Sequence, residues 1–168
     1  MTLSMYQASV PVLLRGLDNL AAILKIGAED AAARKIDESV FINSRLAPDM
    51  FPLSRQVQIA CDGSVRCAAR IAGIDIPSFP DGETTFAELQ TRIEKAQAFL
   101  KTLKPEQLDG AEAREFPVPM RDGSITFTGQ TFLFGWSLPN FFFHITATYL
   151  ILRHNGVALG KANYLGGM

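Results

Sequence analysis

The chemistry open to this chain depends first on its two histidines, His144 and His154. Imidazole nitrogens bind zinc at about 2 Å, and metal sites on helices place two histidines four positions apart, so that one turn brings both rings to the same side. Ten positions in a continuous helix instead separate the rings by about 15 Å along the axis. The two histidines of one chain therefore cannot bind one ion, and we expect neither a metal nor a cofactor.

A mixed metal site at His144 is the alternative. It would need carboxylates or thiols from another helix. The residues of this kind near or on the second long helix are Asp49, Cys61, Asp62 and Cys67. The simpler prediction is a buried His144 ring that is satisfied by a hydroxyl group or by Gln56, because an unpaired polar group inside an apolar bundle costs about 1–3 kcal/mol.

Polar side chains on two of the expected helices could also orient a small molecule in a pocket between them. The ligand-binding candidates are His144, Gln56, Asp62, Asn140 and Thr148. Gln56 and Asp62 could equally face solvent, and the phenylalanines beside His144 are typical of a central, fully packed helix. Gly-rich phosphate loops, nucleophile elbows and paired-cysteine zinc motifs are absent from the sequence. Catalytic residues therefore stay unknown, and whether the chain is an enzyme stays open.

The composition indicates a single domain over residues 1–168. The 16 basic and 17 acidic residues nearly balance, with a formal charge of -1 and no lysine or arginine block, so we expect no nucleic-acid partner. The longest apolar stretch, residues 141–152, is interrupted by polar side chains and is shorter than the roughly 20 residues that a bilayer crossing needs. We expect no membrane span and, because the first residues do not resemble a secretion signal, a cytoplasmic location.

Helical spacing of apolar residues is clearest in the first half of the chain. Residues 10–24 repeat at steps of three and four and predict a first long helix, with Ser4 as its N-cap and Gly27 at its end, followed by a short exposed helical turn. Residues 48–72 repeat in the same way and predict a second long helix that ends at Gly73.

The second half predicts two more helices and a hairpin. Thr85 and Glu88 form a capping-box pattern that opens a third helix. Residues 114–129 alternate with period two around an Asp-Gly turn and predict a small β-hairpin, which would pack as a flap across the bundle. A fourth helix is expected from about Ser137 to His154, where His154 would act as a C-terminal cap donor or dipole partner and an Asn-Gly pair would end the helix. An irregular tail follows.

Three segments of the sequence carry a resemblance to a known family. They are RLAPDMFPLSRQVQIACD, ELQTRIEKAQAFL and LPNFFFHITATYLILRHNGVALGK. Together they resemble a bacterial family, a domain of unknown function placed with the DinB/YfiT-like helical bundles, and the resemblance covers nearly the whole chain. It implies an all-α fold, a DinB/YfiT-like four-helix bundle with the small hairpin between helices three and four, and it implies pairing as a homodimer.

The resemblance also bears on the metal. It implies that metal-binding members of the superfamily carry three histidines, one on helix two and a closely spaced pair on the last long helix. This chain has no histidine on helix two, and its own pair has a different interval. The metal site, and the thiol-transfer and isomerase activities of metal-bearing relatives, are therefore not carried over.

Function should then depend on what takes the place of the metal. Our main hypothesis is that the chain binds a small apolar or amphipathic ligand in an inter-helix pocket, with His144 and Gln56 as polar orienters. The alternative is a metal-dependent transferase or hydrolase that uses His144 with carboxylates or with a partner subunit. A third hypothesis is a structural or interaction module, which needs no pocket.

Overall fold

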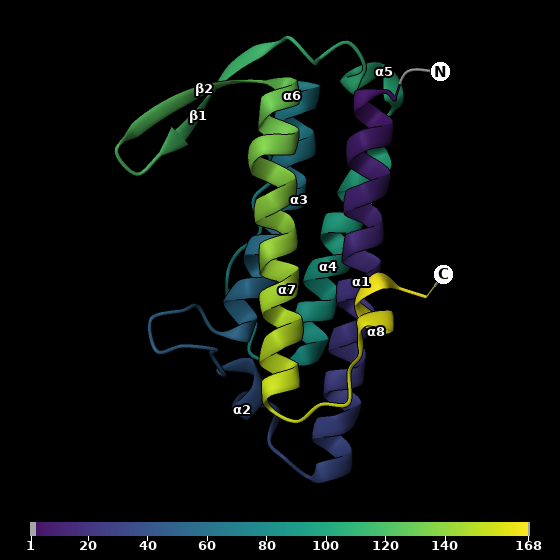
Figure 1. Cartoon of the computed structure of the whole chain (residues 1–168), viewed down its shortest axis with the longest axis vertical. Coiled ribbons are helices and arrows are strands. Elements are labelled where there is room, and N and C mark those ends of the chain that lie inside the picture. Colours follow the sequence, from purple (N-terminus) through teal and green to yellow (C-terminus); the bar gives the residue numbers. More distant parts are fainter. Residues whose placement is uncertain (1–2, 168) are drawn as a thin grey trace.

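The fold is an all-α bundle of four long helices, as the sequence predicts. The structure is a computed structural model and describes residues 3–167. The long helices α1 (Met5–Arg34), α3 (Leu53–Ala72), α4 (Phe86–Thr102) and α7 (Leu138–His154) lie side by side along the long axis of the molecule (Figure 1). No helix in this described range is long and apolar enough to cross a membrane.

Short elements connect the long helices. Between α1 and α3 lies α2 (Glu38–Ile42), and α5 (Pro105–Leu108) follows α4. The hairpin β1 (Glu115–Met120) and β2 (Gly123–Thr128) leads into α6 (Gly129–Phe132), a π-helical turn η1 (Leu133–Ser137) and then α7. A final helix, α8 (Lys161–Leu165), lies where we expect an irregular tail, so that prediction is wrong.

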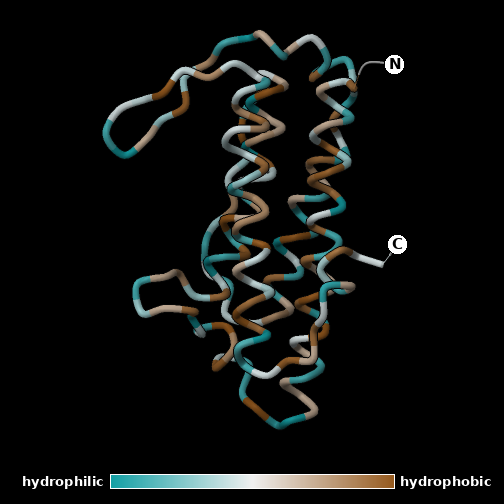
Figure 2. The backbone as a smooth tube through the Cα atoms, in the orientation of Figure 1, coloured by the Kyte–Doolittle hydropathy of each residue, from teal (hydrophilic) through white to brown (hydrophobic). Residues whose placement is uncertain are grey.

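The core lies along the facing sides of the long helices. Figure 2 shows hydrophobic and hydrophilic residues alternating along each of them, which is the pattern expected when one side of a helix is buried. Fully buried residues come from all four helices and include Leu17, Val57, Ile93 and Ile151. At roughly 1.5–3 kcal/mol for each large apolar side chain, their burial supplies most of the energy that holds the bundle together.

Helix α1 begins where the sequence predicts and ends later. Ser4 caps it, accepting a hydrogen bond from the Gln7 N–H. The predicted end at Gly27 is wrong, because this glycine is a buried contact between helices: a Cβ there would lie 3.1 Å from Leu152 and 3.4 Å from Phe86. The helix runs on to Arg34 and ends at Lys35, which has a left-handed backbone with φ 56°.

The predicted boundaries of α3 and α4 are largely confirmed. Helix α3 begins at Leu53, after Pro52 rather than at residue 48, and Gly73 ends it with φ 69°. The capping box of α4 is present, because Thr85 accepts from the Glu88 N–H while the Glu88 side chain accepts from the Thr85 N–H.

The fourth long helix, α7, begins at Leu138 as predicted, and further helical turns precede it without a break. Elements α6, η1 and α7 form one continuous helical rod over residues 129–154, which we call the C-terminal rod. Pro139 lies in the first turn of α7, as predicted, and, because α6 and η1 come directly before it, also inside the rod. Proline has no N–H to donate, and the π turn just before it, with the Leu138 N–H bonded to the Leu133 carbonyl, carries the helix past that missing donor. The predicted Asn155-Gly156 end is confirmed, with Gly156 at φ 87°.

The hairpin lies at the end of the bundle where the rod begins and extends outward from it (Figure 1). Its register pairs Val118 with Ile125 around a tight turn, as expected from the alternating pattern. Val118 is buried against the bundle while Ile125 is exposed. Phe127 of β2 also packs on the rod, with its ring centroid 5.7 Å from that of Phe132 and 6.2 Å from that of Trp136, so both strands of the predicted flap contact the bundle.

Candidate functional site

The His144 ring is held by a hydrogen-bonded network on the buried side of α7. The side chain is 7% exposed, and its Nδ1 lies 2.7 Å from Oε1 of Gln56. Gln56 Nε2 donates to the Phe51 carbonyl, which fixes Oε1 as the acceptor, so His144 donates from Nδ1. Burial, and next the charge of Arg55, lower the pKa of His144, so the ring is neutral at pH 7. The predicted pairing of His144 with Gln56 is confirmed.

The other sequence candidates separate into different environments. The Thr148 hydroxyl donates to the His144 carbonyl, so this side chain is bonded to the backbone of its own helix, α7. Asp62 pairs with Arg92 at 2.7 Å, whereas the partner of His144 is Gln56. Asn140 lines a cavity that His144 does not line. The expected arrangement of all five candidates around one pocket is therefore not what the structure shows.

The residues present do not fit the three-histidine metal centre that the resemblance implies. Helix α3 presents the amide of Gln56 to His144, and an amide hydrogen-bonded to imidazole is not a zinc ligand set. Within residues 3–167, no three His, Cys, Asp or Glu side chains gather closely enough to hold an ion. Cys61 and Cys67 are buried free thiols, and burial raises the pKa of Cys67 to about 12. That the protein binds no metal remains a prediction.

The second histidine has a smaller role than expected. His154 is exposed in the last turn of α7. The carbonyls that follow this turn are bonded by arginines: Arg34 donates to Asn155 at 2.9 Å, and Arg153 donates to Val157 at 3.1 Å. The last carbonyls of α7 itself accept from Asn155 Nδ2 and from the N–H groups of Gly156 and Val157, so other groups perform the capping that the sequence assigns to His154.

We expect replacement of the two histidines to have unequal effects. His144→Ala leaves Gln56 without its partner in the core and should lower the free energy of unfolding by about 1–3 kcal/mol. His154→Ala removes an exposed side chain and should change it by less than about 0.5 kcal/mol. Urea denaturation of both variants measures the difference, and equal stabilities would contradict the network described above.

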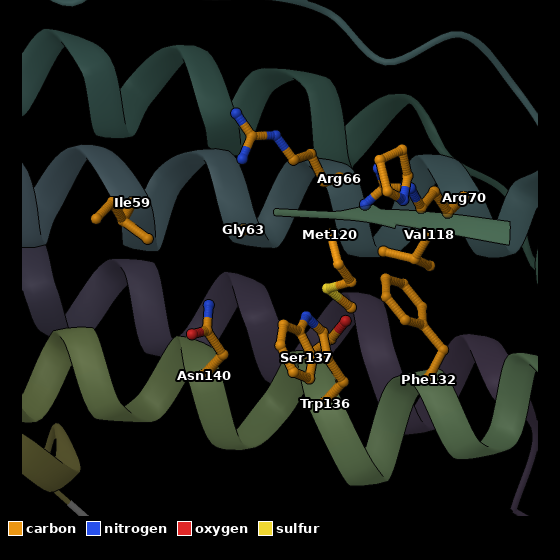
Figure 3. Close-up of a pocket in the computed structure, with 11 residues that line it drawn as sticks. Ile59, Gly63, Arg66, Arg70, Val118, Met120, Phe132, Trp136, Ser137 and Asn140 are labelled. Atoms are coloured by element: carbon orange, nitrogen blue, oxygen red, sulfur yellow. The ribbon is translucent and has the colours of Figure 1, made fainter. Parts of the chain in front are cut away.

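A cavity of about 280 Å³ lies between α3, the C-terminal rod and strand β1 (Figure 3). We call it the hairpin cavity. Its space is equivalent to roughly nine water molecules at liquid density. Gly63 opens it on α3, because a Cβ at that position would meet only the Asn140 side chain, at 3.9 Å. The remaining apolar wall consists of Ile59, Val118, Pro119, Met120, Phe132 and Trp136.

The polar wall of the hairpin cavity is positively charged. Arg66 and Arg70 line it from α3, Ser137 and Asn140 line it from the rod, and no acidic side chain is among the lining residues that the structure describes. Burial, and next the charge of Arg66, lower the pKa of Arg70. The guanidinium of Arg70 lies over the Phe132 ring, 5.9 Å from its centroid. Our sequence reasoning missed Arg66, Arg70 and Trp136, although the pair of arginines four positions apart was visible.

A second polar cluster surrounds Arg92 of α4, which is 1% exposed. Its guanidinium bonds Asp62 at 2.7 Å, Asp81 at 2.9 Å and Glu83 at 2.8 Å, and it also donates to the Pro80 carbonyl at 3.0 Å. Asp81 and Glu83 belong to the linker between α3 and α4, so this arginine ties the linker to both helices. Sequence reasoning missed it, because an arginine in a helical repeat is usually a solvated residue.

The cluster predicts how stability depends on pH. Burial alone would raise the pKa of Glu83, but hydrogen bonds from Arg92, the Gly82 N–H and Gln58 lower it to about 2. A carboxyl whose pKa is lower in the folded state stabilises the fold above its ordinary pKa of 4.5, and this contribution is lost as pH falls toward 2. We expect the free energy of unfolding to fall across this window.

The variant Glu83→Gln isolates this contribution. Its free energy of unfolding should fall less steeply than that of the wild type between pH 4.5 and about 2, measured by denaturation at each pH. Glu94→Gln, at an exposed position of α4, should keep the wild-type slope. A Glu83→Gln profile parallel to the wild type would contradict the assignment.

Comparisons with known proteins give a family and a structural relative. A family model described as "Domain of unknown function (DUF1993)" matches residues 5–165. A crystal structure of a DinB family member protein from Shewanella denitrificans superposes with a TM-score of 0.89 and is 40% identical, and the match covers 97% of this chain and 92% of that chain. Curated proteins give no match. The family match includes every residue of the hairpin cavity.

Proposed function

The chain belongs to the DUF1993 family, a domain of unknown function with a DinB-like fold, and we propose that it binds a small organic molecule in the hairpin cavity. The resemblance that the three sequence segments carry is confirmed by these matches. This proposal keeps the inter-helix pocket that we expect from the sequence, but other residues line it. Asn140 takes the orienting role we assigned to His144 and Gln56, since those two residues do not line the cavity.

One observation supports the proposal most: the cavity sets two arginines and two neutral polar side chains beside an apolar wall, with the polar groups supplying most of its exposed surface. Binding sites for small molecules are concave, and placed polar groups in them fix the orientation of the ligand against apolar surface. Here Met120, Phe132 and Trp136 supply the apolar surface, and Asn140 and Ser137 supply hydrogen-bonding groups on the opposite side from the arginines. A packed structural module would have no reason to leave Gly63 open at such a place.

The single tryptophan of the chain provides the test. Trp136 lines the hairpin cavity, so its emission reports directly on what enters. We would titrate the protein with three flat molecules of fitting size, benzamide, benzoate and phenyl phosphate, and follow Trp136 fluorescence. A saturable change with at least one of them is the expected result, and no change with any of the three would overturn the proposal.

Substitutions at Gly63 provide the matched control. Gly63→Leu should fill the cavity and abolish the saturable change, because only Asn140 lies near the new Cβ. Gly63→Ala should bind as the wild type does and should stabilise α3 by up to about 1 kcal/mol, since alanine has the higher helix propensity. Binding that persists in Gly63→Leu would place the probe elsewhere and would contradict the proposal.

The metal-dependent alternative has no specific observation in its favour. His144 donates from Nδ1 to Gln56, and Asp62, one of the carboxylates considered from the sequence, is paired with Arg92. A ligand from a partner subunit stays a hypothesis. Elemental analysis of the isolated protein tests it, and one metal per chain, lost in His144→Ala, would establish the alternative.

We also propose that the chain forms a homodimer through the outer face of the C-terminal rod. Phe143 and Leu150, seven positions apart, form an exposed apolar stripe, with Phe143 56% exposed. Residues 129–152 contain no charged side chain, so the surface that covers this stripe must itself be uncharged and apolar. The same stripe on a second copy meets that condition across a twofold axis.

Light scattering during gel filtration measures the oligomeric state. The wild type should have twice the chain mass of 18.4 kDa. Phe143→Asp, which introduces a charge into the stripe, should reduce the mass to that of one chain. Val40→Asp, at a similarly exposed position on α2, should leave the dimer intact. A monomeric wild type would overturn the proposal.

A further inference from the structure

The arginines of the hairpin cavity are unequal in how their charges are balanced. Arg66 lies 3.3 Å from Asp62, its neighbour one turn earlier on α3. Arg70, one turn later, has no carboxylate within 4.0 Å anywhere in the described part of the chain, and no hydrogen bond from its guanidinium is present there. Arg70 is half-buried, so solvent screens its charge less than that of a fully exposed arginine.

The wider charge balance on this side of the bundle gives the same result. Arg55, Arg66 and Arg92 are paired with Asp62, Asp81 and Glu83, and these three carboxylates are used in full. None of them remains for Arg70. Two arginines four positions apart on one helix also repel each other, which costs about 0.2–0.5 kcal/mol in an isolated helix. An anion beside Arg70 would balance its charge and would also offset the repulsion between Arg66 and Arg70.

The position of Arg70 suits it to hold such an anion. Its guanidinium is supported from one side by the Phe132 ring, so the side chain is already ordered. Planar guanidinium groups bond the two oxygens of a carboxylate in a parallel pair. The apolar surface of Met120, Phe132 and Trp136 lies in the same cavity (Figure 3).

We infer that the ligand of the hairpin cavity is an organic monocarboxylate with a flat apolar body, its carboxylate bound by Arg70 with Arg66 beside it. This inference rests on the proposed function, since it names the chemical class of the molecule that the cavity takes. One uncompensated positive charge calls for one negative charge. A phosphate ester would bring a second negative charge, for which the cavity has no further unpaired cation among the residues that line it.

The experiment compares benzoate with benzamide, which has nearly the same shape and no charge. Trp136 fluorescence should give a dissociation constant for benzoate about tenfold to a hundredfold lower than that for benzamide, because hydrogen bonds to charged groups are stronger than those between neutral groups. The advantage of benzoate should shrink when sodium chloride is raised, since salt screens the interaction. Equal affinities for the two probes would overturn the inference.

Substitution of Arg70 assigns the charge to one residue. In Arg70→Met the advantage of benzoate over benzamide should fall below about threefold, while benzamide binding is retained. Arg121→Met, on the exposed hairpin turn, removes the same charge from the chain and should keep the wild-type advantage. An unchanged advantage in a folded Arg70→Met protein would overturn the inference. If that variant does not fold, the wild-type comparison with benzamide and its salt dependence decide the question.

The outcomes separate the inference from the proposal on which it rests. Binding of benzamide and benzoate with equal strength, lost in Gly63→Leu, would keep the cavity as a binding site and refute the carboxylate. Tighter binding of phenyl phosphate than of benzoate would also refute it, in favour of a dianion. Binding of none of the three probes would refute the proposed function itself.

Discussion

Arg92→Ala is expected to lower the free energy of unfolding by about 3–5 kcal/mol, because it leaves carboxylates at the bundle surface without their buried counter-charge. The guanidinium bonds Asp62, Asp81 and Glu83 at once. Burial alone would lower the pKa of Arg92, but its hydrogen bonds to Glu83 and Asp62 raise it, so the group is charged at every pH at which the protein is folded. A loss of this size is a large fraction of the stability of an ordinary domain.

The same position distinguishes geometry from charge. Arg92→Lys keeps the charge but cannot reach three carboxylates and the Pro80 carbonyl together, so it should still cost more than about 1 kcal/mol. Lys95→Ala, at an exposed position one turn away, should change stability by less than about 0.5 kcal/mol. Urea denaturation followed by circular dichroism measures all three. A cost below about 1 kcal/mol for Arg92→Ala would show that the cluster does not hold the linker.

Gly129→Ala should have the second largest effect. Gly129 is the first residue of α6, and a Cβ there would lie 2.1 Å from the Ala111 carbonyl oxygen and 3.0 Å from its carbon. These are backbone atoms, and the same crossing is fixed by the Gly129 N–H bonded to the Arg114 carbonyl and the Gln130 N–H bonded to the Glu112 carbonyl. Because neither of the two crossing segments can move without breaking those bonds, we expect the free energy of unfolding to fall by about 3 kcal/mol.

Gly135→Ala is the matched control in the same rod. No atom lies within 4 Å of a Cβ at that position, so alanine should be tolerated or should stabilise the helix by up to about 1 kcal/mol. Thermal unfolding of the two variants side by side gives the comparison. If Gly129→Ala were as stable as Gly135→Ala, the close crossing of the two chain segments would be in error.

The helices were predictable because their signals are local. Apolar repeats and caps such as Ser4 and Thr85 act within one or two turns, and the structure has them where the sequence places them. Glycine and proline were harder to interpret. Gly27 has the same local signature as a helix end, yet its absent side chain admits Leu152 from a helix that is distant in sequence. Pro139 marks the first turn of α7 correctly, but it gives no sign that α6 and η1 precede that turn without a break.

The candidate site was less predictable, for a physical reason. The pairing of His144 with Gln56 follows from the requirement that a buried ring be satisfied, and the sequence could supply it. The hairpin cavity depends on three segments meeting, with Gly63 on α3, Trp136 on the rod and Met120 on β1. The apolar repeat within one segment does not indicate which other segments it will contact. The same holds for Arg92, whose partners are separated from it along the chain.

The π turn at Leu133–Ser137 divides the C-terminal rod into two sections. A change of length at this turn would rotate one section about the helix axis relative to the other. One residue more or fewer at this turn rotates the section before it by about 100° relative to the section after it. Phe132 would then turn away from Arg70, while His144 and its contact with Gln56 would stay in place. A single inserted or deleted residue would thus change both the lining of the hairpin cavity and the buried contacts of Phe132 and Leu133, while the packing of α7 would stay as it is.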